Sequence, residues 1–211
     1  MNPIYTIGHS THPIDRFIRL LSMHGVEAVV DVRSNPSSQR FPQYNRNELK
    51  IALQDHGLHY VFLGRELGAR RREREAYEGR VASYERIAAL PIFRQGLERI
   101  TSGSEKMKLA LTCAERDPLQ CHRTILVCRN LPIEMRNQVL HILDTGLVET
   151  QPDVEVRLIM ESGLNKDQDE LFSTANEGTV LERAYRMRGE RIAWQEEGDE
   201  DIHDRLHKEV G

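Results

Sequence analysis

The feature that most constrains the fold of this 211-residue chain is an alternation of short apolar runs with segments of helical periodicity. The apolar runs predict strands at residues 4–8, 26–32, 58–63, 108–113 and 139–143. The second of these runs is apolar almost throughout, which is typical of a parallel sheet that is covered on both faces. The chain is therefore expected to build a mainly parallel sheet.

Apolar residues at helical spacing fall between these runs. They predict helices at residues 14–24, 47–56 and 121–131, with further helical periodicity over residues 87–100. Gly25 follows the first of these segments, where glycine commonly ends a helix. Strands that alternate with helices predict an α/β fold, Rossmann-like, with three layers and helices on both faces of the sheet.

The pattern loosens towards the end of the chain. We expect an α/β domain over residues 1–145 and a partly helical, acidic extension over residues 146–211. Residues 162–180 are polar and resemble a linker or a lid, and a helix is predicted over residues 180–194. The acidic stretch 196–201 is expected to fray.

Composition narrows the class of protein. Hydrophobic residues make up 39% and charged residues 29%, and no apolar run is long enough to cross a bilayer, so we expect no membrane association. Three cysteines, an odd number, argue against a disulfide framework and for a reducing compartment. Because the first residues also lack the pattern of a signal peptide, a cytoplasmic location is expected. The sequence indicates neither a cofactor nor an oligomeric state.

Charge is distributed unevenly along the chain. Residues 1–130 hold 20 Lys and Arg against 14 Asp and Glu, a net charge of +6, whereas residues 131–211 have a net charge of −10. The basic part suits an anionic small molecule or a nucleic acid, although two differently solvated surfaces would give the same asymmetry. The run Arg70–Arg74 likewise fits either a phosphate-binding segment or a solvated helix face.

Polar side chains follow four predicted strands directly. Because the carboxyl ends of parallel strands share one edge of a sheet, we expect these side chains to converge on one crevice. They are Gly8-His9-Ser10, then Asp31 with Arg33, Ser34 and Asn35, then Gly64-Arg65-Glu66, and finally Cys113 with Glu115.

The donors around this crevice suit an anionic group. Guanidinium groups form forked hydrogen bonds to phosphate or carboxylate oxygens, and serine hydroxyls add neutral donors. The free N–H groups of a helix that begins near Cys121 would point to the same edge. We therefore predict that substrate or anion binding involves Ser10, Arg33, Ser34, Ser38, Asn45, His122 and Arg123.

The segment Cys113–Arg123 is the richest in reactive side chains, and it leaves three interpretations open. In the first, Cys121 is a nucleophile whose thiolate is stabilised by the helix dipole, and Cys113 is an inert core residue. In the second, Cys113, Cys121 and His122 bind zinc or iron, with Glu115, His9 or His141 in support. The spacing of these residues matches none of the paired zinc motifs.

The third interpretation keeps the cysteines structural and gives the chemistry to Asp31, Glu115 and His9. A carboxylate within an apolar strand has to be paired or reach the crevice, because burying it bare is costly. Arg33 lies on the same face of the strand as Asp31, so a purely structural pair of these two residues is the alternative. The candidate catalytic residues are accordingly Asp31, Glu115, Cys121 and His9.

Several of these segments carry a resemblance. Residues 5–11, residues 30–38, Phe41-Pro42 with Asn45, Tyr60 with Leu63-Gly64 and Leu67-Gly68, Cys113-Ala114-Glu115, Cys121-His122-Arg123 and His141-Ile142 resemble the bacterial family known as domain of unknown function 488. The resemblance covers about residues 3–143, and residues 183–193 resemble the end of some members. Two departures are Tyr44, where phenylalanine is expected, and the Ala-Arg-Arg-Arg stretch after Gly68.

The resemblance implies a cytoplasmic α/β protein, but it supplies no settled activity. Together with the crevice, it favours an enzyme that acts on a phosphorylated, nucleotide-like or nucleic-acid substrate. Two alternatives stay open: a nucleic-acid-binding or regulatory module, and a metal-binding or thiol redox protein.

Overall fold

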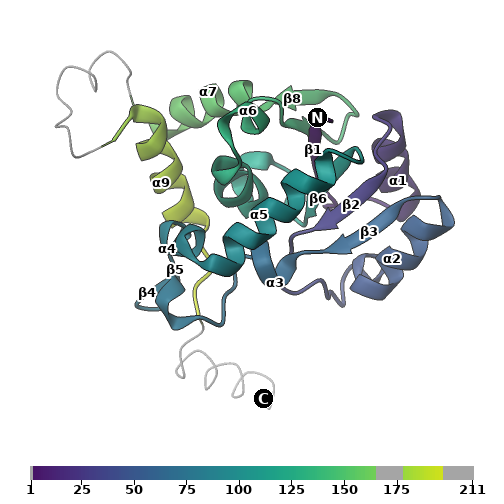
Figure 1. The fold of residues 1–211 in the computed structure, drawn as a ribbon, viewed down its shortest axis with the longest axis horizontal. Helices are drawn as coiled ribbons and strands as arrows, with labels where there is room; N and C mark the ends of the chain where they lie inside the picture. Colours follow the sequence, from purple (N-terminus) through teal and green to yellow (C-terminus); the bar gives the residue numbers. More distant parts are fainter. Residues whose placement is uncertain (1, 165–177, 197–211) are drawn as a thin grey trace, which may run out of the picture.

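A six-stranded sheet forms the centre of the protein in the computed structural model, which describes residues 2–164 and 178–196 (Figure 1). The strand order is β3-β2-β6-β1-β7-β8, and every neighbouring pair is parallel except β7 and β8. The strands are β1 (Ile4–Gly8), β2 (Ala28–Asp31), β3 (His59–Phe62), β6 (Leu109–Cys113), β7 (Leu140–Ile142) and β8 (Val148–Thr150).

Helices lie on both faces of this sheet. The α-helices are α1 (Ile14–Met23), α2 (Arg46–Asp55), α3 (Gly64–Leu67), α4 (Tyr84–Ala89), α5 (Pro91–Ser104), α6 (Ile133–Arg136), α7 (Gln151–Ser162) and α9 (Val180–Ile192). Short helical turns are η1 (Pro42–Tyr44), η2 (Arg74–Ala76), η3 (Pro118–Gln120), η5 (Cys128–Asn130) and η4 (Arg123–Val127), the last of which is π-helical. A small hairpin joins β4 (Tyr77–Glu78) and β5 (Val81–Ala82).

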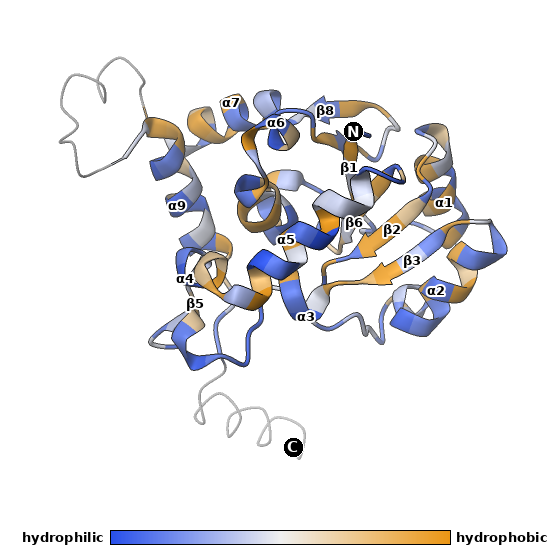
Figure 2. Ribbon diagram, viewed as in Figure 1, coloured by the Kyte–Doolittle hydropathy of each residue, from blue (hydrophilic) through white to orange (hydrophobic). Residues whose placement is uncertain are grey.

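Two hydrophobic clusters show how the layers pack. The first includes Phe17 and Leu21 of α1 and Leu49 of α2, which cover one face of the sheet. The second includes Phe93 of α5 and Tyr185 of α9, on the other face. Figure 2 shows β2 as an apolar strand between these layers, and all four of its residues are buried. Burial on both faces explains why the second strand lacks polar alternation.

Local signals in the sequence determine where several helices begin and end. Pro91 occupies the first turn of α5, where the missing N–H carries no cost. Thr179 and Glu182 form a capping box at the start of α9. Gly163 ends α7 with a φ of 73°, a left-handed conformation that glycine adopts without strain.

The predicted mainly parallel sheet with helices on both faces is confirmed. The edge strand β8 and the helix α7, which directly follows it, were not predicted from the sequence. Most of the predicted linker or lid at 162–180, and nearly all of the predicted frayed segment at 196–201, lie outside the described residues. Among the described helices, none is long and apolar enough to span a membrane.

The carboxyl ends of the three central strands lie side by side. In the parallel register Gly8 is level with Cys113, and Asp31 is level with Thr112. A Cβ atom on Gly8 would lie 1.8 Å from the carbonyl oxygen of Glu115, so the ends of β1 and β6 can approach this closely only with glycine there.

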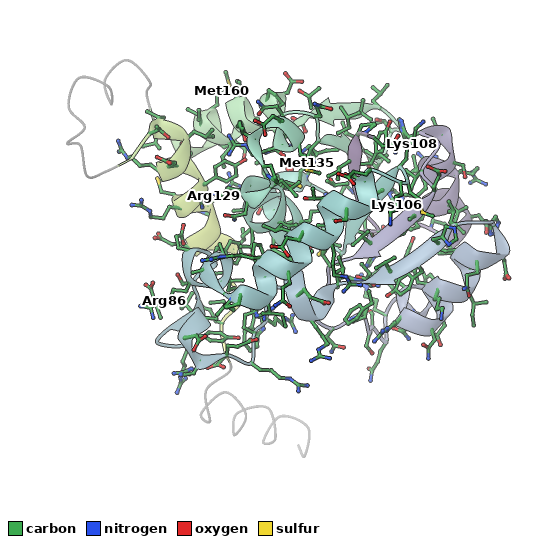
Figure 3. The ribbon with its side chains drawn as sticks, in the orientation of Figure 1. Arg86, Lys106, Lys108, Arg129, Met135 and Met160 are labelled. Carbon is green, nitrogen blue, oxygen red and sulfur yellow. The ribbon has the colours of Figure 1, made fainter. Side chains whose placement is uncertain are left out.

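Side chains fill the layers between the sheet and the helices, while charged side chains such as Arg86 lie on the outside (Figure 3).

Candidate functional site

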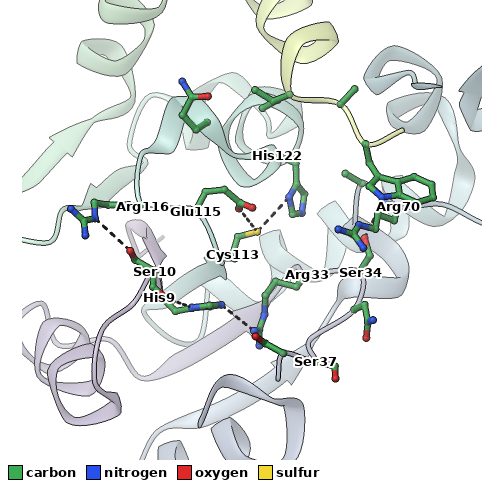
Figure 4. A pocket seen from close by; sticks show the side chains of 18 of the residues that line it. His9, Ser10, Arg33, Ser34, Ser37, Arg70, Cys113, Glu115, Arg116 and His122 are labelled. Carbon is green, nitrogen blue, oxygen red and sulfur yellow. Dashed lines mark hydrogen bonds between the residues drawn. The ribbon is translucent and has the colours of Figure 1, made fainter. Parts of the chain in front are cut away.

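A cavity of about 880 Å³ lies at the carboxyl edge of the sheet, over the ends of β1, β2 and β6. Residues from three strand ends line it, and Figure 4 shows them facing one another. Among the described residues that line it, three are arginines and one, Glu115, is acidic. The cavity therefore carries an excess of positive charge. Of the four predicted strand-end groups, Gly64-Arg65-Glu66 does not reach it.

A group of hydrogen-bonded side chains at the cavity, the Arg33 cluster, consists of His9, Asp31 and Arg33, which are buried, and the half-buried Tyr60. Nε and Nη2 of Arg33 donate to the two carboxylate oxygens of Asp31 at 2.9 and 2.6 Å. The Tyr60 hydroxyl also donates to Asp31, at 2.8 Å. Asp31 is fully buried, so this carboxylate does not reach the cavity and acts by orienting Arg33. The structural pairing that the sequence left open as an alternative is the arrangement observed.

His9 completes the Arg33 cluster as a neutral imidazole. Its Nδ1 donates to the carbonyl oxygen of Ser10 at 3.0 Å, which leaves Nε2 to accept from Nη1 of Arg33 at 3.2 Å. Burial, and then the positive charge of Arg33, lower the pKa of His9 from its ordinary value to about 4. Its ring stacks on Tyr44 with a centroid distance of 4.1 Å.

A second group of side chains forms another part of the cavity wall. This thiol cluster consists of Cys113, Glu115, Cys121 and His122, whose ligand-type atoms all lie within 4.8 Å of one another. Both thiols donate to the same oxygen of Glu115, each at 3.0 Å. The Cys113 sulfur also lies 3.5 Å from Nδ1 of His122. Cys113, Glu115 and His122 line the cavity, whereas Cys121 is buried behind them.

The thiol cluster shifts the acidities of its members in opposite directions. Burial, and then the neighbouring Cys121 and Glu115, raise the pKa of the Cys113 thiol well above its usual range. Burial by itself would also raise the pKa of Cys121. The hydrogen bond with Cys113 and the charges of Arg123 and His122 outweigh burial and hold this pKa well below its usual range. Partial desolvation, and then Cys121, raise the pKa of Glu115.

The predicted regular helix over 121–131 is replaced by the π-helical turn η4 and the short turn η5. A five-residue turn has little macrodipole, so the expected stabilisation of the Cys121 thiolate by a helix dipole does not apply. The backbone N–H of Arg123, 3.5 Å from the Cys121 sulfur, interacts with it directly instead. Single π-helical turns occur frequently at functional sites.

Arg123 is buried and is not among the residues that line the cavity. Its side chain is fully buried, and Nη1 and Nη2 donate to the carbonyl oxygens of Glu115 and Arg116 at 2.6 and 3.0 Å. Nε donates to the Thr6 hydroxyl at 3.3 Å. This guanidinium thus holds the turn after β6 and does not line the cavity.

Of the other predicted residues, some line the cavity and others do not. Ser10, Ser34 and Ser38 line the cavity. Asn45 does not line it, but its side-chain oxygen accepts from the backbone N–H of Ser38 at 2.6 Å and so fixes that loop. His141 is buried away from the thiol cluster, between the Thr6 hydroxyl and the Gln151 side chain.

Trp194 and Arg70 line the cavity. The sequence offered Arg70 only within the run Arg70–Arg74, and it did not indicate Trp194. The guanidinium of Arg70 lies over the Trp194 ring, 5.5 Å from its centroid. Trp194 follows α9, and the backbone of this segment joins the β4–β5 hairpin, where Ala82 N–H donates to the Trp194 carbonyl. That long-range docking could not be read from local patterns; the only signal was that Trp194 is the single tryptophan.

Fold and site define an α/β protein with a mainly parallel sheet and a polar cavity at the carboxyl edge of that sheet. The family model described as "Domain of unknown function DUF488" matches residues 13–129, more than half of the chain, and the chain belongs to this family. No curated protein and no solved structure matches the chain.

Proposed function

We propose that this protein is an enzyme that acts on a phosphorylated, nucleotide-like substrate bound in the cavity at the carboxyl ends of β1, β2 and β6. The observation that carries the proposal is the composition of one cavity: fixed cationic and hydroxyl donors on one side, and the thiol cluster on the other. In open α/β sheets, ligands bind at this edge.

Arg33 is the best placed anion donor. Three of its five N–H groups are taken by Asp31 and His9, which leaves two for a ligand in the cavity that it lines. Because both carboxylate oxygens of Asp31 hold the guanidinium, its orientation is set before any ligand arrives, and less entropy is lost on binding. Ser34 and Ser37 add hydroxyl donors beside it.

The rest of the cavity suits a flat organic group attached to the anion. Phe41 and Trp194 line it, and aromatic faces stack on nucleobases without requiring a particular base. Arg70, beside Trp194, adds a second positive charge. Glu115 and His122, which line the same cavity, are the groups able to move a proton to or from such a ligand.

The test is calorimetric binding of inorganic diphosphate and of adenosine diphosphate at low salt. We expect both to bind the wild-type chain, and the Arg70→Ala variant to bind the nucleotide several-fold more weakly. Arg94→Ala is the matched control, since Arg94 is exposed on α5 and does not line the cavity.

Equal affinity in the wild-type and Arg70→Ala proteins, or no binding of either compound, would overturn the proposal. Salt-sensitive binding of unrelated single-stranded DNA or RNA, unaffected by Arg70→Ala, would overturn it in favour of a nucleic-acid-binding module.

A further inference from the structure

The thiol cluster gathers four side chains whose converging atoms are all of types that ligate metal ions. Two sulfur atoms, a carboxylate oxygen and an imidazole nitrogen converge within 4.8 Å, and none of the four residues carries a permanent positive charge. As anions the thiols and the carboxylate repel one another, and a cation bound between them would remove this repulsion. The Arg33 cluster, by contrast, contains its own cation.

We infer that Cys113, Cys121, His122 and Glu115 bind a divalent transition-metal ion with the coordination preferences of Zn²⁺. Two thiolates, an imidazole nitrogen and a carboxylate oxygen are all ligand types that zinc takes, and four of them complete a tetrahedral shell. With zinc–ligand bonds of about 2.0–2.3 Å, neighbouring ligand atoms in such a shell lie roughly 3.3–3.8 Å apart. The observed separations, 3.0 and 3.5 Å for the bonded pairs and at most 4.8 Å overall, need only small adjustments to reach them.

The surroundings of His122 support this assignment independently. Its Nε2 lies 3.0 Å from the carbonyl oxygen of Val32, and a carbonyl only accepts, so Nε2 carries the proton. The lone pair of the neutral ring is therefore on Nδ1, the atom that faces the Cys113 sulfur. A backbone carbonyl that fixes the tautomer of a histidine in this way is a regular outer partner of metal-binding imidazoles.

The surroundings of Cys121 and Arg123 also suit a bound cation. Two thiolates and a carboxylate around a divalent ion leave one net negative charge. Arg123, fully buried, donates its backbone N–H to the Cys121 sulfur and Nη1 to the carbonyl oxygen of Glu115, so its positive charge lies beside the site. A buried negative centre is stabilised by such a fixed cation and by N–H groups that point at sulfur.

Glu115 differs from the other three residues because it is exposed, whereas the two cysteines are buried and His122 is half-buried. Cys113, Cys121 and His122 thus form the fixed part of the site, and Glu115 is the ligand that can be exchanged. Zinc sites with three fixed protein ligands and one exchangeable position are typical of catalytic rather than structural zinc. The metal inference goes beyond the proposed function and is tested without any substrate.

The experiment measures metal content by elemental analysis, after the full chain has been stripped with a chelator under reducing conditions and reloaded with Zn²⁺. We expect about one ion per chain in the wild-type protein and less than about one tenth of that in Cys121→Ala. Cys128→Ala is the matched control: Cys128 is also fully buried and belongs to the adjoining turn η5, but it is not part of the thiol cluster. It is expected to keep the full equivalent.

Loading with Co²⁺ keeps the inference testable if Cys121→Ala fails to fold. The wild-type and Cys128→Ala proteins should show thiolate-to-cobalt charge-transfer absorption and the intense visible bands of tetrahedral cobalt. Glu115→Gln should retain the charge-transfer absorption and release the ion more readily to a competing chelator. Absence of metal and of these bands in the reduced wild-type protein, or equal loading of wild-type and Cys121→Ala, would overturn the inference.

A thiol titration separates this site from a redox pair. Metal binding should protect two of the three cysteines from a thiol reagent until a chelator is added. Protection that only a reductant reverses would mean a Cys113–Cys121 disulfide and would overturn the inference. A chain that binds zinc but neither diphosphate compound would overturn the proposed function alone.

Discussion

Two polar clusters lie under one cavity, and they differ in how their charges are balanced. In the Arg33 cluster a carboxylate and a guanidinium neutralise each other through two hydrogen bonds. In the thiol cluster three acidic groups meet a histidine, and the buried cation Arg123 lies beside the cluster rather than within it. The charges of the Arg33 cluster are already balanced, and the cluster orients one donor, Arg33. The thiol cluster would gain stability from an added cation, so substitutions in the two clusters should have different effects.

The largest expected effect concerns the Arg33 cluster. Replacing Arg33 with methionine leaves the fully buried carboxylate of Asp31 without its cation, which should lower the free energy of unfolding by about 3–5 kcal/mol. The double variant Asp31→Leu/Arg33→Met removes both charges and should be considerably more stable than Arg33→Met. Urea denaturation measures all of these values.

A surface ion pair is the control for this prediction. Arg86 and Glu78 lie 3.1 Å apart but are more than half exposed, at 51% and 63%, so Arg86→Met should change the free energy of unfolding by less than about 1 kcal/mol. If Arg33→Met were no more destabilising than Arg86→Met, Asp31 and Arg33 would not form the rigid pair described here.

The next effect in size concerns the thiol cluster. An ion that binds only the folded chain should raise the free energy of unfolding by about 2.7 kcal/mol when free zinc is buffered at 100 times its dissociation constant. Cys121→Ala should abolish this increment, and Cys128→Ala should preserve it. The increment should persist in Arg33→Met, because the Arg33 cluster supplies no ligand. Zinc stabilisation that disappears in Arg33→Met instead would show that the two clusters act as one.

The sequence predicted the strands that carry both clusters, because apolar runs and strand-end polar residues are local patterns. It could not predict how the side chains divide between the clusters. Asp31 and Arg33 are two residues apart, so their pairing was foreseeable, whereas Cys113 and Cys121 meet only through the turns that follow β6. The expectation that Cys113 belongs to the core followed from its apolar strand; Cys113 is indeed buried, and it also lies at the cavity wall.

A buried histidine outside both clusters provides a control for acid effects. Burial, and then the charge of Arg123, lower the pKa of His141 to about 3. The unfolded chain takes up this proton below pH 6.5 while the folded chain does not, so the free energy of unfolding falls as the pH drops below 6.5 and levels off near 3. Between pH 6.5 and 4.5 this amounts to on the order of 2 kcal/mol.

His141→Gln should therefore flatten the pH dependence of stability measured by urea denaturation, in the presence of a chelator so that zinc release does not contribute. The substituted amide can still hydrogen-bond to Thr6 and Gln151, the present partners of His141. A variant whose stability falls as steeply with acid as that of the wild-type protein would assign the effect to other groups.

The smallest expected effect tests whether a ligand spans the whole cavity. Trp194→Leu removes the aromatic face beside Arg70 but leaves both clusters intact, so it should weaken binding of adenosine diphosphate by roughly tenfold, about 1.4 kcal/mol, within the range for stacking of one base. Inorganic diphosphate, which has no base, should bind the variant and the wild-type protein equally, as calorimetry can measure. Equal losses for both ligands would mean that Trp194 shapes the anion site itself, and that the base, if one is bound, lies elsewhere.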